Sequence, residues 1–274
     1  MRSVRRKFLS HRGGVISAAF IVLLVLMAAF APFLMPADPS ALSDDVMAPP
    51  SAAHMLGTDE LGRDVLSGLI EGVRVSLAVG FFAALAASII GVLIGALSGY
   101  AGGWFDDIVM RVSEVFQVVP AFILAAVIVA MSGPGMTQII AVIAVLAWPQ
   151  IARVMRGEVI RVKNLEFVDA ARCLGFGNRF ILFAEILPNA VAPVLAAGTL
   201  IVGQAILLEV SLSFLGLSGV DVMSWGRMLN SGQRFLFEAW WLSVFPGTAI
   251  FLTVLAFNLL GDALGIALNP RSAR

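Results

Sequence analysis

The sequence predicts an all-α integral membrane protein with six transmembrane helices. Hydrophobic residues make up 59% of the chain and charged residues only 13%, and the mean hydropathy is +0.96. In soluble globular domains charged residues alone approach about a quarter. Charge-free stretches of roughly 20 residues, enough to cross about 30 Å of hydrocarbon, recur along the chain. The 18 basic and 18 acidic residues cancel, so the net charge gives no reason to expect a nucleic-acid partner.

The predicted spans are separated by polar or turn-forming segments. The apolar stretch over residues 115–152 is too long for one crossing. Ser132-Gly133-Pro134-Gly135 is a turn-forming sequence, so it separates this stretch into the third and fourth spans. In the second span Gly91, Gly95 and Gly99 are four apart on one helical face, which allows another helix to approach closely. The spans are predicted within residues 13–37, 75–105, 115–152 (the third and fourth), 186–208 and 239–261.

The first span has a competing interpretation as a cleaved signal peptide. Residues 1–7 are basic, and Ala29-Phe30-Ala31 resembles a signal-peptidase site. Pro32 directly after that site argues against cleavage, and the apolar run continues beyond it through Met35. We therefore expect an uncleaved first helix.

Four prolines are expected to bend the predicted spans. Pro120, Pro149, Pro193 and Pro246 lie within or near different spans and lack a backbone N–H. Such breaks are tolerated in membranes where neighbouring helices or water satisfy the freed carbonyls. Kinks are the simpler interpretation, and gating hinges are a further hypothesis.

The basic residues predict the orientation of the chain, because Lys and Arg concentrate in the cytoplasmic loops of membrane proteins. With the N-terminus inside, only four of the 18 Lys and Arg residues fall in outer segments, namely Arg63, Arg74, Arg227 and Arg234. Both termini are therefore expected in the cytosol. The outer segments are mildly acidic, which either favours cationic or zwitterionic solutes or simply reflects solvated loops.

A segment of about 30 residues between the fourth and fifth spans is too long for a simple connection. Phe167, Ala170, Ala171 and Leu174 fall at helical spacing, and Gly175 supplies a stop. The segment therefore predicts a short cytosolic helix, whose small Ala170-Ala171 surface would let another backbone come close. Its basic flanks suit a partner with acidic groups. The alternative is an amphipathic helix that lies on lipid headgroups.

Signatures of enzymatic chemistry are missing from the sequence. Its only lysines, Lys7 and Lys163, lack the glycine-rich context of an ATP-binding loop. His11 and His54 are too far apart to suggest a metal site or a catalytic pair, and Cys173 is the only cysteine. We therefore expect a chain that is not an enzyme and holds no cofactor.

A self-sufficient, ion-coupled secondary transporter is the alternative of another class. Such transporters retain ionisable groups deep in the membrane, and only Glu209, in the outer part of the fifth span, is a candidate. We favour a position for Glu209 at the membrane–water boundary. Pairing with Arg74 or Arg227, or a place along the solute path, stays open.

Several motifs resemble those of one transporter family. Asp169-Ala170-Ala171, Gly175 and Ile186-Leu187-Pro188 resemble the Glu-Ala-Ala loop of ATP-binding-cassette importer permeases, with aspartate in place of the usual glutamate. Further blocks resemble the C-type subunits of the dipeptide, oligopeptide and nickel permease family. These blocks are Leu56-Gly57-Thr58-Asp59-Glu60-Leu61-Gly62-Arg63-Asp64-Val65, Leu212-Ser213-Phe214-Leu215-Gly216-Leu217, Ser224-Trp225-Gly226 and Phe257-Asn258-Leu259-Leu260-Gly261-Asp262. In this chain, residues 219–223 lack the double proline common in that family.

The resemblance implies a type I importer permease fold with a cytosolic coupling helix. It implies an N-terminal tail, first helix and outer loop over residues 1–70, a five-helix core over residues 71–267 and a cytosolic tail over residues 268–274. The coupling loop would cover residues 156–188. The residues implied for contact with the ATPase are Glu166, Asp169, Ala170, Ala171, Gly175, Leu187 and Pro188, and those for the path or gate are Glu209, Ser224 and Trp225.

The resemblance also implies the partners and the location. A B-type permease would form the other half of the pathway, and the stripe of Gly91 and Gly95 would fit such an interface. Two separate subunits would bind ATP and Mg²⁺, and an extracytoplasmic binding protein would deliver the solute across a bacterial or archaeal plasma membrane. Peptides are the first expectation for the solute, and nickel chelates, glutathione, opines or oligosaccharides are the alternatives.

Overall fold

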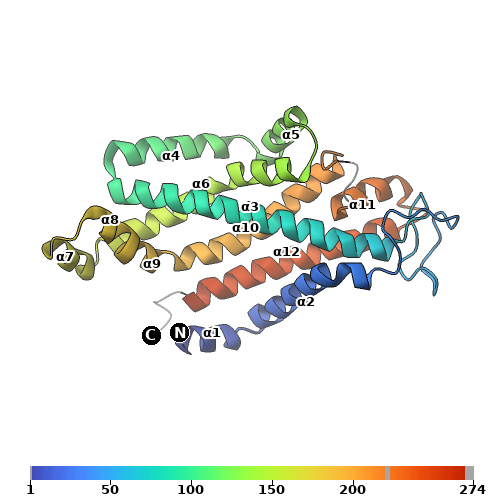
Figure 1. Ribbon diagram of the computed structural model, residues 1–274, viewed down its shortest axis with the longest axis horizontal. Coiled ribbons are helices and arrows are strands. Elements are labelled where there is room, and N and C mark those ends of the chain that lie inside the picture. Colours follow the sequence, from blue (N-terminus) through green and yellow to red (C-terminus); the bar gives the residue numbers. More distant parts are fainter. Residues whose placement is uncertain (1, 220–222, 269–274) are drawn as a thin grey trace.

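The computed structural model describes residues 2–219 and 223–268, and this part of the chain is almost entirely helical. The long helices run roughly along one axis (Figure 1). We call the end that carries α7 and α8 the α7 end, and the end that carries α11 and residues 35–64 the loop end. The elements are α1 (Arg2–Ser10), α2 (Arg12–Leu34), α3 (Val65–Ala101), α4 (Gly103–Val118), α5 (Ala121–Ser132), α6 (Met136–Lys163), α7 (Glu166–Cys173), α8 (Asn178–Phe180), a π-helix (Ile181–Ile186), α9 (Leu187–Ala190), α10 (Ala192–Phe214), α11 (Trp225–Gly232), a 3₁₀ turn (Gln233–Phe235) and α12 (Trp241–Leu268).

The predicted spans are confirmed. Five helices, α2, α3, α6, α10 and α12, are long and apolar enough to cross a membrane, and α4 with α5, which is bent by 86° at its break, makes a sixth where the pair is counted as one span. The bounds differ from those expected. α3 has 37 residues and begins at Val65, and α6 continues to Lys163, so residues 156–163 of the predicted coupling loop are helical. Of the predicted C-terminal tail, residues 269–274 lie outside the described residues.

The prolines do not all act as expected. Pro120 lies at the break between α4 and α5, and Pro149 and Pro246 lie inside α6 and α12. Pro193 instead occupies the first turn of α10, where the backbone N–H of a helix has no partner within the helix and proline costs little. The expected bend at Pro193 is therefore wrong.

The core of the bundle is the contact between α3 and α6. A Cβ atom added at Gly91 would lie 2.7 Å from the carbonyl oxygen of Trp148, and one at Gly95 would overlap the carbonyl oxygen of Ala152. The glycine stripe is thus covered by the backbone of α6 in the same chain. The expectation that it fits a partner permease is wrong, because a free stripe and a helix packed within the chain look alike in sequence.

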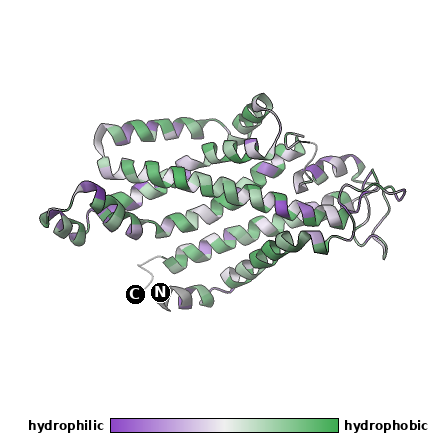
Figure 2. Ribbon diagram, in the orientation of Figure 1, coloured by the Kyte–Doolittle hydropathy of each residue, from purple (hydrophilic) through white to green (hydrophobic). Residues whose placement is uncertain are grey.

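Polar residues gather at the two ends of the molecule, and apolar residues cover the long helices between them (Figure 2). Large apolar side chains on the outside of the bundle are left uncovered, for example Val22, 58% exposed, and Phe81, 56% exposed. An apolar surface of this kind suits lipid or a second membrane subunit rather than water.

Candidate functional site

α7 lies on the rest of the chain with one face and exposes the other. Val168 is fully buried and Ala171 is 7% exposed, and both pack in the main apolar core with Ile181. Ala170 and Asp169 are exposed. The expectation that Ala170 and Ala171 together offer a small outer surface is half wrong, because only Ala170 faces outward.

The charged groups on α7 lie on its exposed face. Glu166 and Asp169 fall in the first turn, where carboxylates interact favourably with the positive end of the helix dipole. Arg172 donates a hydrogen bond to Asp169 Oδ1 over 2.9 Å. This exposed pair contributes little to stability, so both groups are accessible to a partner.

Gly175 ends α7 in the way the sequence predicts. Its φ is +81°, and two hydrogen bonds close the turn, from the N–H of Gly175 to the carbonyl of Arg172 and from the N–H of Phe176 to the carbonyl of Ala171. This pattern is the Schellman motif, which needs a left-handed residue where glycine stands. A Cβ at Gly175 would meet nothing within 4 Å, so the backbone, rather than crowding, requires glycine.

Exposed apolar side chains on both sides of Gly175 form an apolar tip, and the sequence pattern indicated only part of it. Leu174 is 76% exposed, Phe176 46% and Phe180 44%. The rings of Phe176 and Phe180 stack with their centroids 4.6 Å apart. The four-residue spacing of these two phenylalanines in a polar segment is the signal that could have identified the tip.

Leu187 and Pro188 lie apart from this exposed face. They begin α9 after the π-helix Ile181–Ile186, and Leu187 is partly buried against the main core. Pro188 has no N–H to donate, which suits the first turn of a helix. The residues implied for coupling therefore divide into an exposed set on α7 and a pair that begins the return into α10.

The base of the α7 segment is tied to α3 and α6 by polar contacts. Lys163 Nζ donates to the carbonyl of Tyr100 over 2.6 Å and lies 5.2 Å from the centre of its ring. The hydroxyl of Tyr100 donates to Asn178 Oδ1 over 2.9 Å. Tyr100 thus connects the end of α3, the end of α6 and the chain that follows α7.

A second tie joins α4 to α6 at the same end. Arg156 donates two hydrogen bonds to Asp106, from Nε over 2.6 Å and from Nη2 over 2.5 Å, and Ser98 also donates to Asp106. Paired bonds of this kind fix the geometry as well as the charge. Arg111 and Glu114, three residues apart in α4, form an exposed ion pair at 3.2 Å.

Glu209 is not at an open boundary. It is 1% exposed and accepts hydrogen bonds from Ser213 over 2.6 Å and from Ser76 over 3.2 Å. Arg74, one partner considered for it, pairs instead with Glu71 at 3.1 Å. The side chain of Glu209 does not meet open solvent, and its depth in the membrane stays a prediction. The hydroxyl donors from α3 and α10 satisfy the carboxyl group within the protein.

Ser224 and Trp225 hold α11 against α3 and α10 near Glu209. Ser224 is the N-cap of α11 and accepts a hydrogen bond from the N–H of Arg227. Trp225 is fully buried, and its Nε1 donates to the carbonyl of Leu69 over 3.0 Å. The ring lies against Gly72, where a Cβ would be 2.7 Å from Nε1. Neither side chain faces an open path, and their role in a gate stays a prediction.

Replacing Trp225 with alanine should destabilise the protein strongly. The change removes a buried ring and its hydrogen bond, and truncations of this size cost about 3–5 kcal/mol. Thermal unfolding of the detergent-solubilised protein should show a clear decrease in midpoint. Trp104→Ala is the matched control because Trp104 in α4 is 75% exposed. Equal midpoints for both variants would contradict the packing described here.

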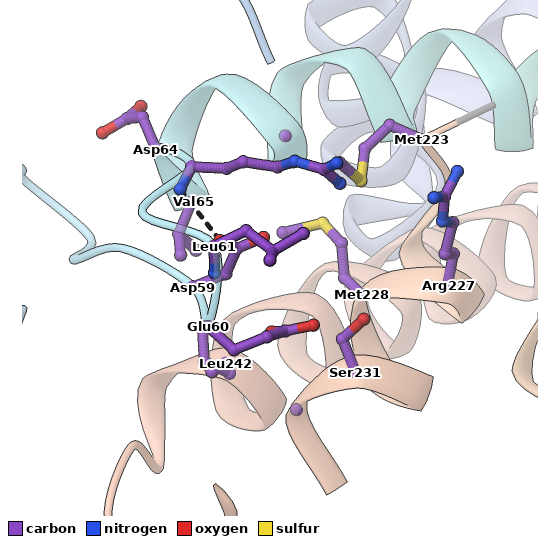
Figure 3. A pocket seen from close by; sticks show the side chains of 13 residues that line it. Asp59, Glu60, Leu61, Asp64, Val65, Met223, Arg227, Met228, Ser231 and Leu242 are labelled. Carbon is purple, nitrogen blue, oxygen red and sulfur yellow. Dashed lines mark hydrogen bonds between the residues drawn. The ribbon is translucent and has the colours of Figure 1, made fainter. Parts of the chain in front are cut away.

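The loop end contains a cavity of about 110 Å³ between residues 59–65 and α11. Figure 3 shows Glu60 and Leu61 on one side of it and Met228 and Ser231 on the other. Glu60 Oε2 and Arg63 Nε are buried without a hydrogen-bond partner among the described residues. Burial raises the pKa of Asp59 at its rim, against hydrogen bonds from the amides of Arg63 and Leu61. The cavity therefore offers both an acceptor and a donor.

Within the described ranges no group of three or more His, Cys, Asp or Glu residues could hold a metal ion. Long apolar helices with a short exposed helix at one end and a structured polar surface at the other are typical of a membrane transport subunit.

Comparison with known proteins identifies the family. The family described as "Binding-protein-dependent transport system inner membrane component" matches residues 87–274. The "N-terminal TM domain of oligopeptide transport permease C" matches residues 1–50. The chain belongs to the binding-protein-dependent permeases of ATP-binding-cassette transporters, and within them to the C-type permeases.

Several named relatives resemble the chain over nearly its whole length. The glutathione transport system permease protein GsiD of Pectobacterium atrosepticum is 40% identical over 273 residues, which cover 98% of this chain and 91% of the relative. The dipeptide transport system permease protein DppC of Alkalihalophilus pseudofirmus is 37% identical over 272 residues, with 98% and 90% covered. The di/tripeptide permease DppC of Pseudomonas aeruginosa is 38% identical over 275 residues, with 97% and 90% covered.

Solved structures support the fold. Two inward-facing structures of the MetNI methionine ABC transporter superpose with TM-scores of 0.61 and 0.60 at 19% and 20% identity. They cover 74% of this chain and 96% and 97% of those chains. At this identity the likeness concerns the fold alone. It confirms the type I importer permease architecture expected from the sequence.

Proposed function

We propose that this permease forms half of the pathway of a peptide importer and that α7 is its coupling helix. The observation that carries the proposal is the exposed face of α7. Leu174, 76% exposed, and Phe176, 46% exposed, present apolar surface, while Val168 and Ala171 fix the other face to the core. An apolar patch with a polar rim is typical of a protein interface. A B-type permease would supply the other half of the pathway.

Two separate ATP-binding subunits, with their ATP and Mg²⁺, would dock on this face. A rigid-body movement of those subunits would reach the bundle through the contacts of Tyr100, Lys163 and Asn178. The α7 end would then face the cytosol of a bacterial or archaeal cell, together with the N-terminus. Arg63, Arg74, Arg227 and Arg234 would belong to the outer side, as the distribution of basic residues favours.

The loop end would receive the external binding protein. The cavity beside α11 offers buried, unpaired polar atoms of Glu60 and Arg63, which a polar side chain of a docking protein could satisfy.

The relatives bear names that refer to glutathione, dipeptides and di/tripeptides. Small peptides are therefore the proposed solutes, and nickel chelates, opines and oligosaccharides are the alternatives for a binding-protein screen.

The single cysteine allows a direct test of the coupling assignment. Cys173 lies on α7 and is exposed, so a photo-crosslinker attached to it should capture an ATP-binding subunit in native membranes. Met55, 64% exposed at the loop end, gives the matched control. In a Cys173→Ser, Met55→Cys variant the same reagent should capture the binding protein and no ATPase. Crosslinks from Cys173 to lipid alone would instead favour an interfacial role for α7.

The rival class of secondary transporter makes a different prediction. The complex purified in mild detergent and placed in liposomes should take up solute only with ATP inside and binding protein outside. Uptake that follows a proton gradient without these components would overturn the importer proposal. Glu209 would then be the residue to study, although Ser76 and Ser213 already satisfy its carboxyl group.

A further inference from the structure

A cavity of about 310 Å³ opens on the bundle between α5, α6 and α10. Two glutamines line it, Gln150 on α6 and Gln204 on α10, together with Ser211. Gln204 lies near the middle of α10, and Gln150 lies in the apolar part of α6, three residues before Arg153. Both positions fall within the predicted membrane spans. Both side chains are exposed.

Neither glutamine has a side-chain hydrogen bond within residues 2–219 and 223–268, whereas Ser211 donates to the carbonyl of Leu207 over 2.7 Å. An amide group in contact with lipid would leave two donors and its acceptor oxygen unsatisfied, which is costly. Many exposed residues on the outside of the spanning helices are apolar, for example Leu93 on α3, although Asn258 on α12 is exposed as well. The face that carries Gln150 and Gln204 is therefore unsuited to lipid.

The broken span points to the same cavity independently. Ala121, the first residue of α5, lines it, and the chain bends by 86° between α4 and α5 just before this residue. The ends of two helices leave backbone N–H and carbonyl groups without partners in their own helices. At membrane depth such a break is tolerated only where it is enclosed in protein or lines a water-filled cavity. Discontinuous helices occur at the solute sites of other transporters.

We propose that this cavity is part of the solute path, and that the amides of Gln150 and Gln204 form hydrogen bonds with the peptide groups of the solute. This inference rests on the proposed function as a peptide importer, and it identifies the residues that would contact the solute. An amide side chain both donates and accepts, so it matches the N–H and carbonyl groups of a peptide whatever the solute's side chains are. The lining contains no Asp, Glu, Lys or Arg, so no fixed charge holds a zwitterionic solute in place.

The first test replaces each amide by leucine, which has a similar size and no hydrogen-bonding group. The complete importer, with its binding protein, is reconstituted in liposomes, and ATP-driven uptake of a dipeptide is measured beside ATP hydrolysis. Loss of one hydrogen bond to the solute should lower uptake about three- to tenfold in Gln150→Leu and in Gln204→Leu. ATP hydrolysis stimulated by the binding protein should persist. Gln138→Leu, in the first turn of α6 and outside the cavity, should behave as the unmodified protein.

The second test measures access of water to the cavity. Gln150→Cys and Gln204→Cys are treated with a charged, water-soluble thiol reagent in the nucleotide-free and vanadate-trapped states, and modified peptides are identified by mass spectrometry so that Cys173 is counted separately. We expect both positions to react in at least one state. Leu93→Cys, on an apolar outer face where the side chain is 47% exposed, should not react in either.

Failure of this inference is distinguishable from failure of the proposed function. If the unmodified complex shows no ATP-driven uptake, the importer proposal fails. If that uptake is normal but neither cysteine reacts in either state, the cavity is filled by the partner permease or by lipid, and the inference is overturned. Unchanged uptake in both leucine variants, or a parallel loss of ATP hydrolysis, would overturn the contact between the amides and the solute.

Discussion

Replacing Gly175 with valine should abolish uptake while the protein still inserts in the membrane. Gly175 has φ +81° and ends α7 through the Schellman hydrogen bonds. A β-branched residue in the left-handed region is a clear outlier, and that conformation costs L-residues about 1–2 kcal/mol. Because α7 has only eight residues, the loss of its final turn would displace the exposed tip at Phe176. Uptake and ATP hydrolysis in reconstituted vesicles would measure this loss of coupling.

Gly177 provides a matched control two residues away. Its φ is −71°, and a Cβ there would also meet nothing within 4 Å, so Gly177→Val fits the existing backbone. Gly175→Asn should retain more uptake than Gly175→Val, since asparagine tolerates the left-handed region. Equal loss in Gly175→Val and Gly177→Val would mean that bulk at the tip, rather than the backbone turn, decides coupling.

Gly95→Ala should prevent the bundle from folding, although alanine is normally the better helix former. A Cβ at Gly95 would overlap the carbonyl oxygen of Ala152, and the backbone carbon of Ala152 would lie 2.9 Å away. Backbone atoms inside two packed helices cannot move aside as a flexible side chain can, so α3 and α6 would have to separate. The amount of monodisperse protein extracted in mild detergent should fall strongly.

Gly157→Ala is the matched control, because the same substitution should there leave the stability unchanged or raise it. Gly157 is an exposed position in α6 where a Cβ would meet nothing within 4 Å. The same substitution there should leave stability unchanged or raise it by up to about 1 kcal/mol, through helix propensity. Thermal unfolding of the two variants in one detergent would compare them. A loss of stability at both positions would show that the close contact of α3 and α6 is not the cause.

The sequence predicted the features that depend on local chemistry. Apolar length determines which segments can span a membrane, so the spans were identified although their bounds shifted. Gly175 was correctly placed at the end of a helix, because the left-handed turn depends only on the few residues around it. The motifs around Asp169 and Trp225 led to the family, which the relatives confirm.

Contacts between distant segments had to come from the tertiary structure. Glu209 was expected at a boundary, but Ser76, 133 positions away in the chain, and Ser213 enclose it. In the sequence, Gly95 lies on a stripe of small residues that was expected to face a partner permease. In the structure, the backbone of α6 covers it. The sequence did not distinguish Gln150 and Gln204, because both are uncharged residues in apolar stretches. Only the packing of α5, α6 and α10 brings them to one cavity.

The sequence by itself therefore determined that this protein is a polytopic permease with a short helix on a long loop, because hydrophobic length, turn chemistry and motifs are properties of neighbouring residues. The tertiary structure decided which face of each helix is covered. A spanning helix can be apolar on all sides, so its periodicity does not distinguish the face that meets lipid from the face that meets another helix or an open cavity.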